Sequence, residues 1–260
     1  MDEIRPVKLY KYRHWNDNTK KILINNELYF QSAENFNDPF DANIILDMDA
    51  TPAEWISRAV LLHNHYGGEM PKSEYQKMCS VLYHITEEER AYFSKNVTEL
   101  VTQEVRKNTG IYCFTKSEDN ILMWSHYANE HKGICLEFDH SAPALFSAAK
   151  VNYCFDYPKV NYFTSTYDEL MNIRYFTKAK DWEYEQEYRI VIPDFSSQIK
   201  AIESQIITGA ICGCCMPDED IKEVIAILQD RPTPTMLYKA EKKKYGFGLD
   251  IVPIKQYGNI

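Results

Sequence analysis

The sequence predicts a mixed α+β fold with a mostly antiparallel β core and one helical insertion. Short strand-like segments lie in both halves of the chain and are separated by short helices and turns. Between them, residues 53–107 carry apolar side chains at helical spacing, beginning with Trp55, Ala59 and Leu62. A length of 260 residues suits one large domain or two small ones. We therefore expect a single α+β domain, residues 1–260, into which the helices of 53–107 are inserted.

The individual elements follow from local patterns along the chain. Runs of alternating or continuously apolar residues predict strands at 7–13, 27–32, 110–116, 133–139, 178–192, 201–213, 235–241 and 246–254. Apolar residues at helical spacing predict helices at 19–26, 53–107, 121–130 and 217–229. Within the insertion, breaks are expected near Gly67 and Thr86, and Ser117 is the expected N-cap of the helix at 121–130.

Composition excludes several classes of protein. The chain has 38 acidic and 29 basic residues and a net charge of -9, which predicts no broad nucleic-acid surface but leaves a local basic groove open. Its 7 cysteines are scattered and odd in number, which is typical of reduced thiols in the cytoplasm. The cluster CGCC at 212–215 has no second Cys or His pair at zinc spacing, so we expect no metal. No apolar run has the length of a membrane span, so we expect no contact with membranes.

The segment 178–192 carries an unusual row of charges. Glu183, Glu185, Glu187 and Arg189 recur at a spacing of two, so on a strand they would share one face. A row of three acids is costly unless cations answer it or unless the acids take part in chemistry. Two interpretations follow: a strand whose acids form salt bridges across the sheet, or a functional site.

The first predicted strand supplies cations for either interpretation. Its alternation places Lys11 and Arg13 on one face and Tyr10 and Tyr12 on the other. The strand is then either an edge strand with a solvated charged face or a cationic strand end that binds phosphate through the fork of the Arg guanidinium.

The segment 36–41 (FNDPFD) has the composition of a turn. Asn37 and Asp38 precede Pro39, which ends regular structure. Asp38 and Asp41 could also form salt bridges with the cations of the first strand. Because loops often carry function, we retain a site role for this turn as an alternative.

The helix predicted at 121–130 concentrates aromatic side chains that have polar tips. Trp124 and Tyr127 lie near one stripe with His126 beside it, and His131 follows. A single histidine is usually structural, whereas two flanking one short helix favour a site. The chain has no Gly-rich phosphate loop and no nucleophile elbow, so a Ser-His-Asp hydrolase is not supported.

Taken together, these blocks resemble the bacterial family called domain of unknown function 2971. The matching pieces are LYKYR, ELYF, FNDPFD, CFTKSEDNILMWSHYANEHKGICLEF and KAKDWEYEQEYRIV, which span residues 9–192 in the order of the family. Genes of this family often resemble accessory cargo of mobile or defence regions, which implies a toxin or an antiphage-defence effector.

The order of elements is also similar, more distantly, to the ADP-ribosyltransferase fold. Those enzymes place a His or Arg on a first strand, a Ser or Tyr after a middle strand and a Glu on a late strand. Here Arg13 or Tyr12 matches the first position, Thr115 or Tyr127 the second, and Glu187 the third, with Glu185 as accompanying acid.

This resemblance implies NAD as substrate and no metal. Glu187 would stabilise the oxocarbenium-like state that forms when the nicotinamide–ribose bond breaks. Arg13 would hold a phosphate or the ribose, and Trp124 or Tyr127 would stack on nicotinamide. The predicted catalytic residues are Glu187, Glu185, Arg13, Tyr127 and His126. The residues predicted to contact NAD are Lys11, Tyr12, Asn37, Asp38, Thr115, Trp124, Lys132, Trp182 and Arg189. The further partner would be a macromolecular acceptor, either protein or nucleic acid, unless the enzyme simply hydrolyses NAD.

Two alternatives remain open. A metal-independent nuclease acting on RNA or DNA would use His126 as general base and bind phosphate through Lys11, Arg13, Lys132 and Arg189. A ligand-sensing module of a defence system would bind a small molecule in the aromatic and acidic pocket and a partner protein through the helices of 53–107.

Overall fold

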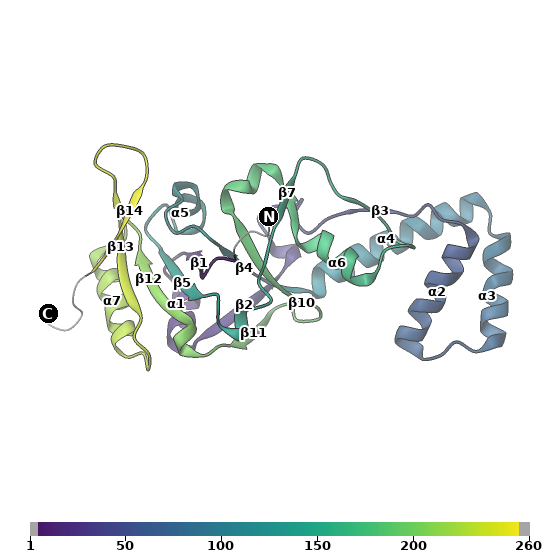
Figure 1. The fold of residues 1–260 in the computed structure, drawn as a ribbon, viewed down its shortest axis with the longest axis horizontal. Helices are drawn as coiled ribbons and strands as arrows, with labels where there is room; N and C mark the ends of the chain where they lie inside the picture. The colour runs from purple at the N-terminus through teal and green to yellow at the C-terminus, as the bar shows by residue number, and fades with distance from the viewer. Residues whose placement is uncertain (1–4, 255–260) are drawn as a thin grey trace.

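The computed structural model describes residues 5–254, with the side chains of 65–67, 100, 101 and 104 left out. It is a mixed α+β structure built on a largely antiparallel, open sheet of 10 strands (Figure 1). The strands are β1 (Lys8–Arg13), β2 (Glu27–Ser32), β3 (Ile45–Asp47), β4 (Gly110–Thr115), β5 (Ile134–Asp139), β6 (Ala149–Lys150), β7 (Asn152–Cys154), β8 (Lys159–Asn161), β9 (Thr177–Ala179), β10 (Glu187–Ile192), β11 (Gln198–Ala201), β12 (Ile207–Cys212), β13 (Met236–Lys242) and β14 (Leu249–Pro253). The helices are α1 (Asp17–Asn25), α2 (Pro52–Gly67), α3 (Lys72–His84), α4 (Glu87–Asn108), α5 (Ile121–Tyr127), α6 (Tyr167–Tyr175) and α7 (Asp218–Gln229).

The sheet opens beside β4, and this opening creates the space for a site. The strands follow the order β11-β2-β4-β1-β5-β12-β13-β14, and β10 lies along the other edge of β4. β10 pairs with the whole of β4, whereas β2 pairs only with Gly110 and Ile111 and β1 only with Thr115. In the described part of the chain, residues 112–114 therefore have a strand partner on one side only, because β1 and β2 diverge there.

Two apolar clusters hold the sheet, one on each face. On one face, α1 and α7 pack over the strands through residues such as Leu23 and Val224, both fully buried. On the other face, α5 packs through Met123 and Trp124 against Tyr12 and its neighbours. Alternation along β1 thus sends its tyrosines under α5, as the sequence predicts.

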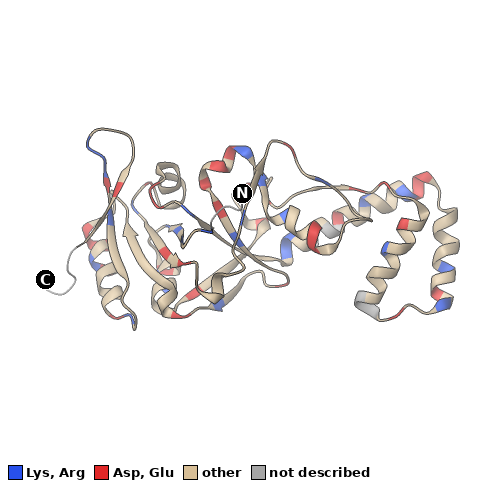
Figure 2. Ribbon diagram, viewed as in Figure 1, with Lys and Arg blue, Asp and Glu red and all other residues tan. Residues whose placement is uncertain are grey.

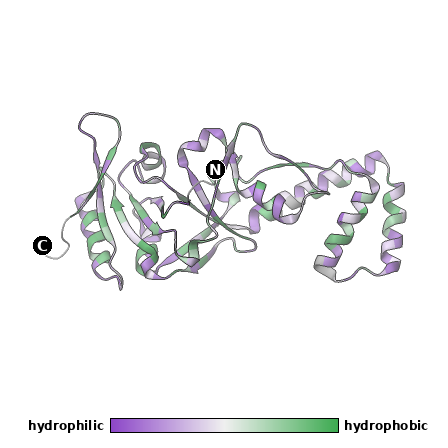
Figure 3. Cartoon of the chain, viewed as in Figure 1, coloured by the Kyte–Doolittle hydropathy of each residue, from purple (hydrophilic) through white to green (hydrophobic). Residues whose placement is uncertain are grey.

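The insertion expected at 53–107 is present as the three helices α2, α3 and α4, which project from one end of the sheet (Figure 1). Thr51 and Thr86 begin α2 and α4 with capping boxes. In each box the threonine side chain accepts from the backbone N–H of a glutamate, and that glutamate side chain accepts from the backbone N–H of the threonine. The helix α3 has no buried residue, and Figure 3 shows hydrophobic positions along α2 and α3. None of the helices within residues 5–254 has both the length and the apolar character that crossing a membrane requires.

Three local expectations are wrong. Residues 180–185 form a 3₁₀ helix, η3 (Lys180–Glu185), because Gln186 takes a left-handed conformation that separates it from β10. The N-cap of α5 is Asn120 rather than Ser117, since its side chain accepts from the N–H groups of Leu122 and Met123. β1 is also no edge strand, because it pairs with β4 and β5.

A close backbone approach at Gly213 fixes the loop that follows α5. A Cβ at Gly213 would lie 2.1 Å from the carbonyl oxygen of His131 and 3.0 Å from that of Gly133. We expect Gly213→Ala to lower the free energy of unfolding by about 1–3 kcal/mol, because both backbones must separate. Urea denaturation should show this loss. Gly246→Ala should leave stability unchanged, because a Cβ added at Gly246 would have no neighbouring atom within 4 Å. Equal stability of the two variants would contradict this account.

Candidate functional site

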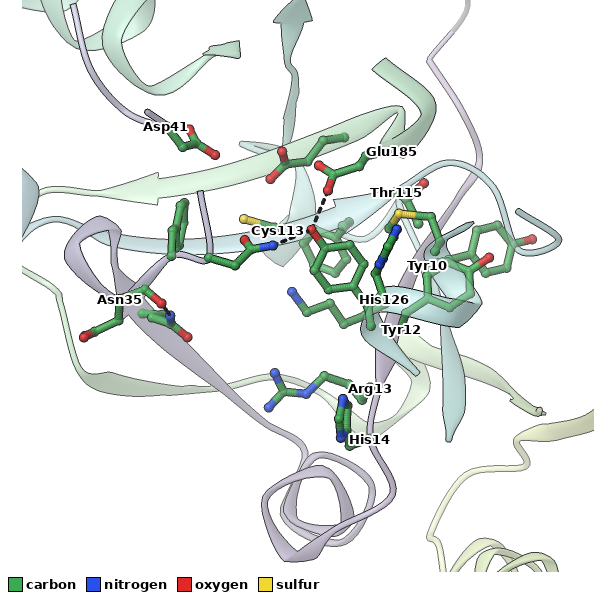
Figure 4. Close-up of a pocket in the computed structure, with 18 of the residues that line it drawn as sticks. Tyr10, Tyr12, Arg13, His14, Asn35, Asp41, Cys113, Thr115, His126 and Glu185 are labelled. Carbon is green, nitrogen blue, oxygen red and sulfur yellow. Dashed lines mark hydrogen bonds between the residues drawn. The ribbon is translucent and has the colours of Figure 1, made fainter. Parts of the chain in front are cut away.

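The opening between β1, β2 and β4 contains a cavity of about 370 Å³. Its walls come from the ends of β1 and β2, the segment 35–37, the middle of β4, α5 and the junction between η3 and β10. The size falls within the range of small-molecule pockets, roughly 300–1,000 Å³. Figure 4 shows Glu185 and Asp41 on one side of this space and Arg13 and His14 on the opposite side.

The acidic side is built around Glu185. The Tyr127 hydroxyl donates to Glu185 Oε1 at 2.6 Å, and Lys178 Nζ donates to Oε2 at 2.5 Å. Asn37 Nδ2 donates in turn to the Tyr127 hydroxyl at 3.2 Å. Glu185 is only 3% exposed, yet it lies in the lining of the cavity. The carboxylate is thus held in one orientation by groups from α5 and β9.

Glu187 is held more completely. Arg189 donates to both of its oxygens, from Nε and Nη2, each at 2.8 Å. Lys178 Nζ lies 3.3 Å from Glu187 Oε2, and the backbone N–H of Glu187 donates to the Tyr153 hydroxyl. Arg189 also binds both oxygens of Asp41, at 2.8 and 2.5 Å. Arg189 is fully buried, so these contacts lie away from water.

The two glutamates differ in their pKa as a result. Burial raises the pKa of Glu185, and the charge of Glu187 adds to this effect while Lys178 opposes it. Burial also disfavours the charge of Glu187, but Arg189 and Lys178 outweigh it and hold the pKa of Glu187 well below its ordinary value. Burial disfavours the charge of Lys178 too, yet the surrounding carboxylates raise its pKa. Three acids therefore face two cations in this cluster, and of the two glutamates Glu185 takes up a proton more readily.

The opposite side of the cavity carries basic side chains. Lys11, Arg13 and His14 line it from the end of β1, together with Asn16 and Asn18 from the start of α1. Burial lowers the pKa of Lys11, and its ammonium group lies 5.0 Å from the centre of the Tyr112 ring. Among residues 5–254 no ion pair joins Lys11 or Arg13 to an acid.

The expected salt bridges therefore have different partners. Asp41 and Glu187 are paired with Arg189 and Lys178, rather than with the cations of the first strand. Asp38 is buried as well, and its Oδ1 accepts from the backbone N–H of Phe40 as in an ordinary turn. Lys11 and Arg13 are left facing the cavity.

The structure brings together most of the residues that the sequence predicts for the site. In the lining are Lys11, Tyr12, Arg13, Asn37, Thr115, His126, Tyr127, Glu185 and Glu187. The predicted residues outside it are Asp38, Trp124, Lys132, Trp182 and Arg189. Trp124 is fully buried, and its indole N–H donates to the carbonyl of Glu118, so it packs in the core beneath α5. Lys132 pairs with Glu130 on the surface, and Trp182 lies against the ammonium group of Lys178.

Sequence reasoning missed Lys178, which contacts all three carboxylates of the cluster. It also missed His14 and the amide side chains of Gln31 and Asn35, which line the cavity. A signal existed for Lys178, because it lies in the same short segment as Glu185 and Glu187. No signal marked Gln31 and Asn35, since the divergence of β1 and β2 alone brings them to the site.

No group of three or more metal-ligating side chains occurs among the described residues. Comparison with known proteins finds one family whose model matches the segment that carries most of the acidic cluster. Residues 123–190 match the model of the family described as "Protein of unknown function (DUF2971)". This segment includes α5 from Met123 onward, Lys178, Glu185 and Glu187. No curated protein and no solved structure matches the chain. The chain therefore carries the DUF2971 signature, which confirms over residues 123–190 the family resemblance that its sequence motifs indicate.

Proposed function

We propose that this protein transfers ADP-ribose from NAD, in the manner of an ADP-ribosyltransferase-like enzyme, to a macromolecule or to water. One observation carries the proposal: a buried carboxylate, Glu185, faces a cationic wall of Lys11 and Arg13 across a cavity of about 370 Å³. A dinucleotide can present ribose hydroxyls to Glu185 and its diphosphate to Lys11 and Arg13. The order of β1, α1, β2, β4, α5 and β10 along the chain agrees with the ADP-ribosyltransferase resemblance.

In this proposal Glu185, rather than Glu187, is the reacting carboxylate. Both oxygens of Glu187 are bound by Arg189, which leaves it as a positioning residue that fixes Lys178. One oxygen of Glu185 accepts a hydrogen bond from the Tyr127 hydroxyl, and a ribose hydroxyl can take the place of this donor. With Glu185 ionised, the cluster of three acids and two cations carries one excess negative charge beside the cavity.

That charge suits the bond that breaks. When the bond between ribose C1′ and the nicotinamide nitrogen breaks, its electron pair goes to the nitrogen and the ribose acquires oxocarbenium character. A nearby carboxylate stabilises this positive charge. An oxygen of water or of an acceptor then bonds to C1′ and gives up its proton to Glu185. Phe36 and Tyr127 line the cavity and supply faces on which nicotinamide can stack.

Nicotinamide release from NAD by the purified protein tests the proposal, with and without cell lysate. Release without lysate would identify water as acceptor, and release that needs lysate would identify a macromolecule. Absence of release in both conditions, from folded protein, would sink the proposal. His126 lines the same cavity as Lys11 and Arg13, so the same samples should be tested for metal-independent cleavage of RNA and DNA, which His126→Ala would abolish in a nuclease.

The pH profile gives a second test. Glu185 acts as a carboxylate, and its pKa is raised above the ordinary 4.5 by burial and by Glu187. It therefore becomes protonated, and inactive, at a higher pH than an exposed glutamate. We expect initial rates to fall on acidification with a midpoint above 4.5, while thermal denaturation at each pH shows that the protein stays folded. A midpoint at or below the ordinary value would contradict the role of Glu185.

A further inference from the structure

The loop that joins β13 and β14 carries the two most exposed large apolar side chains among residues 5–254. Phe247 is 103% exposed and Tyr245 is 90% exposed. Figure 1 shows this hairpin loop projecting from the end of the sheet opposite the helical insertion. A single exposed aromatic residue needs no explanation, but two at the tip of one projecting hairpin form a contact surface.

The exposure does not come from a poorly formed hairpin. β13 and β14 pair without interruption from Tyr238–Pro253 to Lys242–Leu249. The backbone N–H of Lys243 donates to the Gly248 carbonyl at 3.1 Å and closes the loop. Gly248 has a φ of 141°, a conformation that favours glycine, so the sequence is compatible with this turn. The two rings are thus presented by a defined backbone.

The same loop is strongly cationic in an acidic protein. Lys242, Lys243 and Lys244 are consecutive and exposed, while the whole chain has a net charge of -9. Figure 2 shows basic residues along this loop and acidic residues where the loop joins β13 and β14. The ammonium group of Lys244 lies 5.1 Å from the centre of the Tyr245 ring. A partner of this loop must therefore be anionic and must offer flat or apolar groups to the rings.

Single-stranded nucleic acid meets both requirements, because its phosphates bind lysines and its bases stack on aromatic rings. An anionic membrane also attracts lysines and aromatic residues, but three lysines supply only about 1 kcal/mol each. A membrane is also a plane, so its approach would bring the acidic surface of the same protein close to anionic lipids. A single-stranded nucleic acid can contact the loop without approaching the rest of the protein surface.

The hairpin is also connected to the candidate site. Ala240 and Leu249, on its two strands, pack in one cluster with Met123 and Trp124 of α5. The following residues of α5 reach the cavity, where Tyr127 binds Glu185. A nucleic-acid strand bound at the loop would therefore be held by a hairpin that packs against α5, and α5 forms one wall of the cavity.

We propose that the β13–β14 loop is a binding site for single-stranded RNA or DNA, in which Tyr245 and Phe247 stack on bases and Lys243 and Lys244 contact phosphates. The proposal does not depend on the reaction of NAD and can hold or fail without it. If both hold, the bound strand is the acceptor or positions it.

Fluorescence anisotropy of labelled oligonucleotides of about 20 thymidines or uridines, at low salt and without NAD, tests this site. We expect Tyr245→Ala/Phe247→Ala to weaken binding by about tenfold or more, because each base stack is lost. The matched control is Phe155→Ala/Tyr157→Ala, which removes two exposed aromatic residues at the same spacing in another loop and should bind as the wild type does.

The lysines are tested through the dependence of binding on salt. For single strands the slope of log K against log salt changes by about 0.7 for each phosphate contact. Lys243→Ala/Lys244→Ala should therefore reduce the slope by about 1.4, whereas Lys72→Ala/Lys77→Ala on α3 should leave it unchanged. The substituted side chains are exposed, so circular dichroism should show unchanged folding.

Three results would overturn the assignment: no binding by the wild type at low salt, equal losses in the hairpin and control variants, or binding to phosphatidylserine vesicles without binding to oligonucleotides. The last result would assign the loop to a membrane surface.

Discussion

Replacement of Glu185 with glutamine is expected to lower nicotinamide release from NAD by about 10²–10³-fold, the usual cost of removing one electrostatic group that stabilises a transition state. Glutamine keeps the shape and an oxygen that accepts from Lys178, but it carries no charge to oppose the oxocarbenium ion. The raised pKa of Glu185 indicates that a neutral side chain is well tolerated at this position, so the variant should fold. Turnover and thermal denaturation of the same sample separate the two effects.

Two other glutamates of the same segment serve as controls. Glu183 is exposed and pairs with Lys180, so Glu183→Gln should retain full activity. Glu187→Gln removes a charge that binds Arg189 and Lys178, and it should lower stability as well as turnover. If Glu185→Gln turned over NAD normally while folded Glu187→Gln did not, the reacting carboxylate would be Glu187.

Replacement of Arg189 with methionine is expected to lower the free energy of unfolding by about 3–5 kcal/mol, the cost of breaking a buried ion pair by removing one partner. Arg189 is fully buried and binds Asp41 and Glu187 through four hydrogen bonds to their carboxylates. Without it, two carboxylates share the single charge of Lys178 with Glu185. Urea denaturation with circular dichroism measures the change.

Lys159→Met is the matched control for Arg189→Met. Lys159 forms an ion pair with Asp47 at 3.0 Å, but its side chain is 63% exposed. Exposed pairs contribute about 0–1 kcal/mol, so this variant should unfold almost as the wild type does. A loss at Lys159 as large as that at Arg189 would show that burial does not set the strength of these contacts.

The segment from Lys178 to Ile192 shows how far local pattern reaches. Its alternating acids require cationic partners, and in the structure Lys178 and Arg189 supply them. The pattern fails on geometry, since the left-handed conformation of Gln186 ends a 3₁₀ helix and puts Glu183 on the surface. It also fails on pairing. The distant residue Asp41 reaches Arg189 only because the turn at 36–41 folds over β10.

The sequence by itself determined most strands of the core sheet and the helical character of the insertion. Short-range periodicity predicted these elements and the alternation of β1, because they depend on residues a few positions apart. The tertiary structure alone decided which charges are neutralised and which face the cavity. Arg189 pairs with Glu187 and Asp41, while Glu185 keeps a raised pKa and Lys11 and Arg13 have no acidic partner among the described residues. The physical reason is that a pairing between charges 148 residues apart depends on where the sheet opens, and no local pattern encodes that opening.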